Sequence, residues 1–242
     1  MTQIKALQDI LLKGEITPEN HWELRVIQSE NCQSYVAWNT NTREAIIVDP
    51  KDTDDHAYHS IVATLPNYLW LAIIDTHTHA DHISIASKLA KDLKAPLLMH
   101  ERSPSRRVDI RVSRETEIPT HAGPLKIFLT PGHTQDSITV LWGPYLFGGD
   151  TVLYGDVGRD DLPGGDAGAH FDSVNHLKEC ILPNAIVLPG HDPKDGRASS
   201  WATQLKINSS LTQSRQEFIA EAEAFNAPAP KLLKESLKEN FK

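Results

Sequence analysis

Cysteine is almost absent from this sequence. Only Cys32 and Cys180 occur among the 242 residues, and they lie far apart along the chain. So few thiols exclude a disulfide-bonded framework and a thiolate-rich metal site. We interpret both cysteines as small buried apolar residues, and their scarcity favours a reducing compartment.

Long apolar runs and an excess of positive charge are also missing. No stretch approaches the roughly 18 apolar residues of a membrane span, and the amino terminus lacks the basic and apolar regions of a secretory signal. The net charge of -8 argues against nucleic acid as a partner, because affinity for nucleic acid comes mainly from lysine and arginine at phosphates. We therefore expect a cytoplasmic protein that binds neither a membrane nor nucleic acid.

The length and the residue pattern predict one folded domain with short additions at both ends. Residues 1–20 form a peripheral segment, residues 21–198 alternate short apolar strands with helices, and residues 199–242 form a helical extension. Within that extension we expect a helix over 213–225 that buries Phe218, Ala222 and Phe225. A proline-containing break and a charged tail follow it.

Histidine is unusually frequent in this chain. There are 12 copies, and the sequence from 77 to 82 reads His-Thr-His-Ala-Asp-His. This cluster directly follows the apolar stretch 68–74, which predicts a loop at the carboxyl end of a buried strand. His77, His79, Asp81 and His82 would be desolvated polar groups unless a cation binds them, so the spacing indicates a metal site rather than a chance polar loop.

Three later turns end on further ligand types. His133, Asp150 and His191 each follow a short apolar strand and a glycine-containing turn. Glycine allows positive φ and a close approach of the backbone, so a rigid strand end can direct the next side chain inward. We expect these three residues to join the histidine cluster at one site.

The order of these ligands resembles the metallo-β-lactamase superfamily. Its pattern is a His-x-His-x-Asp-His loop followed by a later His, an Asp and a final His, here residues 77–82, His133, Asp150 and His191. The resemblance implies an α/β fold of the αββα sandwich type, with the metal centre at one edge. It does not by itself name the substrate, because one fold can carry several chemistries.

Within that superfamily the chain looks most similar to the glutathione persulfide dioxygenases, with glyoxalase II as a near relative. The segment Gly155-Asp-Val-Gly-Arg159-Asp-Asp-Leu162 is similar to the family segment whose arginine helps to hold the glutathionyl substrate. Few residues follow His191, which favours the dioxygenase over glyoxalase II with its longer helical domain. One departure is Ile85, which stands where family members usually have glycine.

The resemblance implies a mononuclear Fe(II) centre with His77, His133 and Asp150 as its three ligands. A glutathionyl or other persulfide and O2 would be the substrates, and sulfite and glutathione the products. Arg159 and Thr134 are the residues implied for substrate binding, and Asp81 and Arg159 for catalysis. A homodimer is the assembly that the resemblance suggests.

A dinuclear Zn(II) hydrolase of glutathione thioesters is the main alternative, because every ligand it needs is present. One zinc ion would bind His77, His79 and His133, the other would bind Asp81, His82 and His191, and Asp150 would bridge them. Water held between the ions would then attack a thioester carbonyl. A non-catalytic metal-binding module is a second alternative, although such a protein would be expected to have lost part of the ligand set.

Overall fold

The computed structural model describes residues 21–29, 31–191 and 198–242. The expected peripheral segment 1–20 lies outside these residues. In the described part of the chain, none of the helices combines the length and the apolar character needed to cross a membrane.

The first sheet combines a meander of strands with parallel crossovers. Its strands, in spatial order, are β1 (Trp22–Ser29), β2 (Cys32–Asn39), β3 (Glu44–Val48), β4 (Leu69–Ile74), β5 (Leu97–His100) and β6 (Ile110–Val112). β1, β2 and β3 pair antiparallel, whereas β3 to β6 pair in parallel. β3 is buried along its whole length, as expected for a strand covered on both faces.

The second sheet is built mainly from antiparallel neighbours. Its strands are β7 (Thr116–Ile118), β8 (Leu125–Leu129), β9 (Ile138–Trp142), β10 (Tyr145–Gly149), β11 (Ile186–Pro189) and β12 (Ser199–Ser200). β8 and β10 both run antiparallel to β9, and β11 runs parallel to β10. The carboxyl ends of β8, β10 and β11 therefore meet at the same edge of this sheet.

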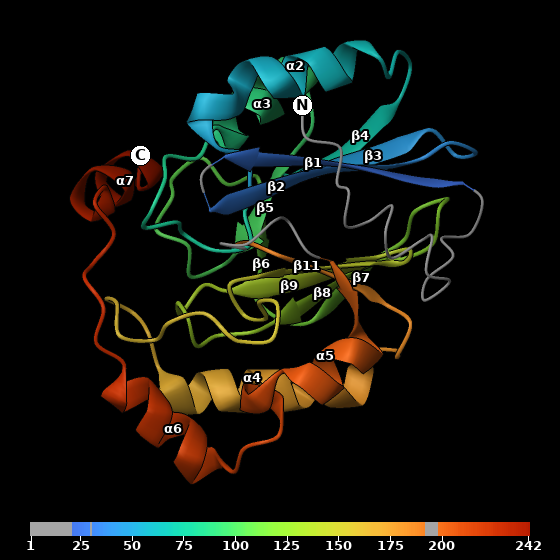
Figure 1. Cartoon of the computed structure of the whole chain (residues 1–242). Coiled ribbons are helices and arrows are strands. Elements are labelled where there is room, and N and C mark those ends of the chain that lie inside the picture. Colours follow the sequence, from blue (N-terminus) through green and yellow to red (C-terminus); the bar gives the residue numbers. More distant parts are fainter. Residues whose placement is uncertain (1–20, 30, 192–197) are drawn as a thin grey trace.

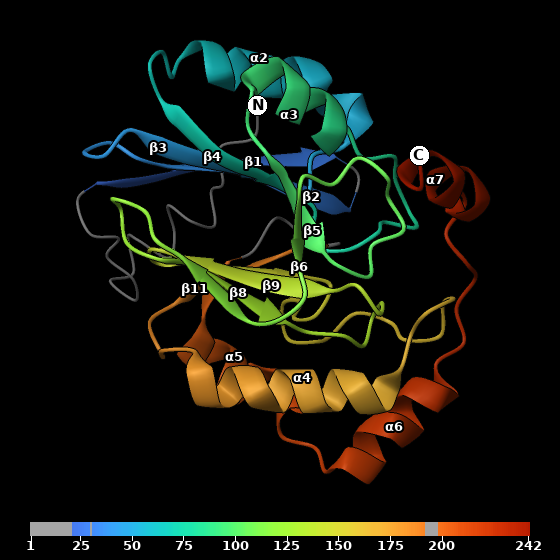
Figure 2. The ribbon, with the colours of Figure 1, turned by 180° about the vertical axis from the view of Figure 1, so that it is seen from behind.

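Helices cover the outer face of each sheet, which gives four layers (Figures 1 and 2). Over the first sheet lie η1 (Asp52–Asp54), α2 (Asp55–Ala63) and α3 (Ala86–Leu93). Under the second lie α4 (Ala167–Cys180), α5 (Trp201–Ile207), η2 (Ser209–Leu211) and α6 (Arg215–Ala224). The structure confirms the predicted αββα sandwich.

The core lies mainly between the two sheets. Trp142 and Phe147 of the second sheet pack there against Ile46 and Ile74 of the first, and all four are fully buried. Burial of such large side chains provides much of the driving force for folding. It also holds the loops at the sheet edge in fixed positions.

The charged tail contains a further helix, α7 (Leu233–Asn240). Two sequence predictions about side-chain burial in the carboxyl-terminal half were wrong. Phe218 is buried as predicted, but Phe225 is 48% exposed because α6 ends before it and its ring lies against Arg159. Cys180 is exposed at the end of α4, whereas Cys32 is buried.

Candidate metal centre

Loops from both sheets meet at one edge of the sandwich. His133 follows β8, Asp150 follows β10 and His191 follows β11, so the common direction of these strands places all three together. The histidine loop 75–84 follows β4 of the facing sheet. The backbone of Thr76 accepts a hydrogen bond from the N–H of Ile138, which joins this loop to the second sheet.

Three of the expected ligands form one compact, buried group. One potential ligand atom from each of His77, His133 and Asp150 lies within 4.8 Å of the others. Nε2 of His133 is 3.4 Å from Oδ2 of Asp150, and Nε2 of His77 is buried without a hydrogen-bond partner. A buried polar atom without a partner is costly, and a cation bound here would remove that cost. These residues therefore fit a metal ion.

Hydrogen bonds fix how the two histidine rings face this group. Nδ1 of His133 lies 2.6 Å from the carbonyl oxygen of Arg159, so this nitrogen must carry the proton. The hydroxyl of Thr76 donates to Asp49 and lies 3.0 Å from Nδ1 of His77, so Nδ1 of His77 must donate to it. In the neutral form of each ring, the proton is therefore on Nδ1, and Nε2 is the nitrogen that can bind a metal.

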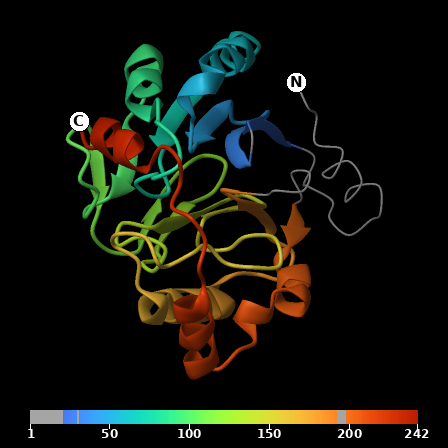
Figure 3. The ribbon, with the colours of Figure 1, turned by 60° about the vertical axis from the view of Figure 1, so that its left-hand side comes forward.

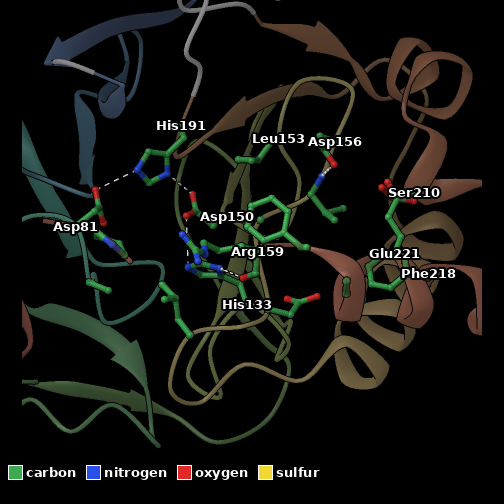
Figure 4. A pocket seen from close by; sticks show the side chains of 18 of the residues that line it. Asp81, His133, Asp150, Leu153, Asp156, Arg159, His191, Ser210, Phe218 and Glu221 are labelled. Atoms are coloured by element: carbon green, nitrogen blue, oxygen red, sulfur yellow. Dashed lines mark hydrogen bonds and ion pairs between the residues drawn. The ribbon is translucent and has the colours of Figure 1, made fainter. Parts of the chain in front are cut away.

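His191 connects Asp150 to Asp81 (Figure 4). Its Nδ1 is 2.6 Å from Oδ1 of Asp150, and its Nε2 is 3.0 Å from Oδ2 of Asp81. The same oxygen of Asp81 is 3.1 Å from Nδ1 of His82 and accepts from the thiol of Cys32 at 3.0 Å. Asp81, His82 and Cys32 form a second compact group of potential ligands.

His79 belongs to a third group rather than to the first. Its Nε2 lies 3.3 Å from Oδ1 of Asp49 and 3.9 Å from Oδ1 of Asp75, and all three side chains are buried. The ring of His79 still packs against that of His77, with 4.2 Å between the ring centres. The structure thus separates His79 from the His77, His133 and Asp150 group.

The electrostatics of the site follow from burial and from neighbouring charges. Burial would raise the pKa of Asp150, but His191 and His133 outweigh it and hold that pKa far below its usual range. Burial and then the neighbouring His79 and His133 lower the pKa of His77 well below its usual value. Burial also raises the pKa of Asp75 to about 6. An ionised carboxylate and a neutral imidazole are the forms that bind metals.

Two glycines explain how the loops come so close. Gly149 has φ of +51°, and a side chain there would meet the hydroxyl of Thr76 at 2.4 Å. A side chain at Gly190 would meet Oδ1 of Asp150 at 2.6 Å. These turns thus require glycine, one for its backbone conformation and both for space.

A cavity of about 380 Å³ opens beside the group of His77, His133 and Asp150, which we call the metal group. Part of its wall is apolar and consists of Leu153, Val157, Phe218 and Phe225. The wall nearest the metal group contains Asp81, His133, Asp150 and His191. Arg159 also lines it, yet its guanidinium pairs with Asp161 and donates to the carbonyls of Ala227 and Pro228. The hydroxyl of Thr134 lies 2.8 Å from that of Ser137, within the turn that carries His133.

Sequence reasoning missed three residues that contact the site. The thiol of Cys32 meets Asp81, and buried His170 lies between Asp160, at 2.7 Å, and the carbonyl of Thr151, at 2.9 Å. Asn240 of α7 bonds to the histidine loop. His170 and Asn240 lie far from the metal motifs in the sequence, so no local pattern could have indicated them.

No protein-family model matches the chain. The chain is 28% identical over 210 residues to a mitochondrial persulfide dioxygenase, ETHE1, of Mus musculus, which spans 85% of this chain and 82% of that protein. It is 30% identical over 196 residues to a hydroxyacylglutathione hydrolase of Anaeromyxobacter dehalogenans, which spans 78% of this chain and 73% of that protein. The crystal structure of ETHE1 from Myxococcus xanthus superposes with a TM-score of 0.83 and 29% identity, covering 90% of this chain and 98% of that one.

Proposed function

Because this chain belongs to the metallo-β-lactamase superfamily, we propose that it is an iron-dependent persulfide dioxygenase. The observation that carries the proposal is the compact group of His77, His133 and Asp150, from which His79 is separated. Two imidazoles and one carboxylate are the ligand set of mononuclear Fe(II) oxygenases, whereas the dinuclear alternative needs His79 at the first ion. Similarity to persulfide dioxygenases over most of both chains supports the same activity.

The proposed reaction oxidises the outer sulfur of glutathione persulfide, or of a related persulfide, with O2 and water to sulfite, and releases the thiol. The sulfur supplies the electrons, so no further reductant is required. When bound, Fe(II) supplies the open coordination positions and the redox chemistry of this reaction. The role of the protein is to orient the ligands, to bind the organic part of the substrate and to hold protons in place.

The imidazole rings of the proposed ligands are held through their Nδ1 atoms, which would not bind the metal. The carbonyl of Arg159 binds Nδ1–H of His133, and the hydroxyl of Thr76 accepts from Nδ1–H of His77. His191 donates from both ring nitrogens, to Asp150 and to Asp81, and the pKa of His191 is accordingly raised well above its usual value despite burial. We assign Asp81 to the reaction as the carboxylate that keeps the Nε2 proton of His191 beside the cavity.

The cavity beside the metal group is the proposed substrate site. Its apolar wall suits the carbon chain of a persulfide, and Arg159 brings a guanidinium group to its lining. We propose that Arg159 attracts a carboxylate of the substrate, and that Thr134 contributes through its position next to His133. The pairing of Arg159 with Asp161 means that this attraction is partly neutralised within the chain.

A dinuclear Zn(II) hydrolase is the second candidate function. The second ligand group of Asp81, His82 and Cys32, with His191 beside it, is the observation in its favour. The similarity to a hydroxyacylglutathione hydrolase supports the same alternative. In that enzyme, two zinc ions would generate hydroxide for attack on a thioester.

Oxygen uptake distinguishes the two candidates. Anaerobically purified protein loaded with Fe(II) should consume O2 and form sulfite when glutathione persulfide is added. Zn(II)-loaded protein tested with S-lactoylglutathione provides the paired measurement, and we expect no hydrolysis. Hydrolysis without oxygen uptake would overturn the dioxygenase proposal, and absence of both activities in metal-loaded protein would favour a binding module.

A further inference from the structure

The carboxyl-terminal helix α7 contacts the histidine loop through the amide of Asn240. Nδ2 of Asn240 donates to the carbonyl of His79 and to the carbonyl of His82, both at 2.9 Å. Oδ1 of Asn240 accepts from the backbone N–H of Ser84, also at 2.9 Å. Figure 3 shows the red end of the chain leaving α6 and crossing to the first-sheet side of the molecule, where α7 lies.

The central part of the histidine loop, residues 77–82, depends on such contacts. Among the described residues, no backbone-to-backbone hydrogen bond involves positions 77–82. Yet His79 and His82 are each only 2% exposed. Buried carbonyl groups require donors, and an asparagine amide offers two donors and an acceptor on one planar group. The amide of Asn240 therefore makes the hydrogen bonds to backbone groups of this loop that neighbouring strands or helical turns make in regular secondary structure.

A continuous series of contacts leads from this loop to the metal group. Asp81 lies between the two residues whose carbonyls Asn240 binds, and its Oδ2 meets Nε2 of His191. His191 in turn meets Asp150 at 2.6 Å, and Asp150 belongs to the compact ligand group. A displacement of the loop would therefore move Asp81, then His191, and alter how Asp150 faces an ion.

We propose that Asn240 is a positioning residue of the metal centre, which fixes the histidine loop and, through Asp81 and His191, the Asp150 ligand. The proposal rests on the metal site of the proposed function, but not on the identity of its substrate. It assigns a role to α7, which lies far beyond His191, the last residue of the metal motifs. Removal of groups that orient metal ligands typically weakens metal affinity by about 10- to 100-fold.

The neighbouring residue Glu239 provides a matched control. It lies on the same turn of α7, and its carboxylate pairs with Lys242 at the end of the chain. Its removal should leave the amide of Asn240 in place. Three variants of Asn240 give a series: Asn240→Ala removes the donors and the acceptor, and Asn240→Ser retains a single donor. Asn240→Asp keeps an acceptor for the N–H of Ser84 but replaces the donors by a negatively charged oxygen that faces the carbonyls of His79 and His82.

The test uses the full-length protein with Co(II) as the added ion. Metal affinity is measured by competition with a chelator, and the visible spectrum is recorded at saturating Co(II) to report ligand geometry. We expect Asn240→Ala and Asn240→Asp to lose about 10- to 100-fold in affinity and to show altered spectra. Asn240→Ser should lose less, and Glu239→Ala should match the wild type.

Thermal unfolding of the metal-free variants separates positioning from a purely structural role. Lower stability with wild-type affinity and an unchanged Co(II) spectrum would overturn the proposal, because Asn240 would then only anchor α7. If Asn240→Ala does not fold, the same criteria apply to Asn240→Ser. Neither measurement requires catalytic turnover. If the wild-type protein binds the ion but takes up no oxygen, only the dioxygenase proposal is overturned. If the wild-type protein binds no ion, the dioxygenase proposal and the positioning role of Asn240 are both overturned.

Discussion

Arg159 and Asp161 form a bidentate ion pair, with Nε 2.6 Å from Oδ1 and Nη2 2.7 Å from Oδ2. Arg159 lines the cavity beside the metal group, while the ring of Phe225 lies 5.2 Å from its guanidinium carbon. The arginine that we propose for substrate binding is therefore already paired within the chain. An anionic substrate would be attracted by only part of its positive charge, because Asp161 neutralises the rest.

Release of this pairing should strengthen the binding of an anionic persulfide. In Asp161→Asn the arginine retains its bonds to Ala227 and Pro228 but loses its carboxylate partner. We expect KM for glutathione persulfide to fall by about threefold, the size of an effect from a partly exposed ion pair. Asp156→Asn removes a charge from the same cavity and should change KM less. A rise in KM in Asp161→Asn would mean that Asp161 orients Arg159 for the substrate.

Loss of Asp150 should abolish metal binding. This carboxylate is the anionic member of the compact group, and the imidazoles of His77 and His133 alone provide too few ligands. We expect Asp150→Ala to purify without stoichiometric metal and without activity, as measured by elemental analysis and oxygen uptake. Asp156→Ala, also at the cavity, should keep its metal. Full metal occupancy in Asp150→Ala would contradict the ligand assignment.

The metal content of His191→Ala separates one ion from two. In a mononuclear centre His191 would orient Asp150 without binding the ion, so the variant should fold and still bind one ion, with affinity about 10-fold lower. A dinuclear centre would instead lose half of its metal, because His191 would be a ligand of the second ion. Elemental analysis of wild type and variant, prepared side by side, gives the comparison.

Glu44 makes stability depend on acid pH. Its buried carboxylate accepts from the ring Nδ1 and the N–H of His121, both at 3.0 Å, and from the N–H of Ala122 at 2.8 Å. Burial acts to raise the pKa of Glu44, but these bonds outweigh it and lower that pKa below its usual value of 4.5. The contribution to stability is therefore present above pH 4.5 and disappears as the pH falls through the lowered pKa.

Urea unfolding of Glu44→Gln across the pH range checks this dependence. At pH 7 the variant should be less stable than wild type by about 1.5 to 3 kcal/mol, as expected for bonds to a charged group. The two proteins should converge in stability as the pH is lowered toward about 3. Exposed Glu117, which pairs with Lys126 at 2.7 Å, supplies the control, and Glu117→Gln should have little effect at any pH.

Phe218 and Phe225 should differ sharply in their contribution to folding. Phe218 is 3% exposed and packs against Phe171 and His170, so Phe218→Ala should lower the free energy of unfolding by about 3 to 5 kcal/mol. Phe225 is 48% exposed, so Phe225→Ala should cost less than about 1 kcal/mol. Denaturant unfolding of both variants measures the difference. Equal decreases in the free energy of unfolding would contradict this difference and would favour the sequence prediction that one helix face buries both rings.

Local sequence features predict the ligand types and the loops that carry them. Apolar strands end in glycine-containing turns before His133, Asp150 and His191, and the structure places all three at one sheet edge. These features are local: strand length, turn residues and side-chain type are all encoded within a few positions. The αββα sandwich could also be predicted, because the resemblance of the ligand motifs to the metallo-β-lactamase superfamily implies it.

Which of these groups face one another depends on the folded structure. The sequence offers His77 and His79 equally, yet the fold directs His79 toward Asp49 and Asp75 and brings His77 to Asp150. The role of Asn240 could not be predicted, because its amide bonds to backbone groups of a loop far away in the sequence, and such polar contacts leave no local pattern. Contacts between residues so distant along the chain depend on packing of the whole molecule, and local sequence pattern does not encode them.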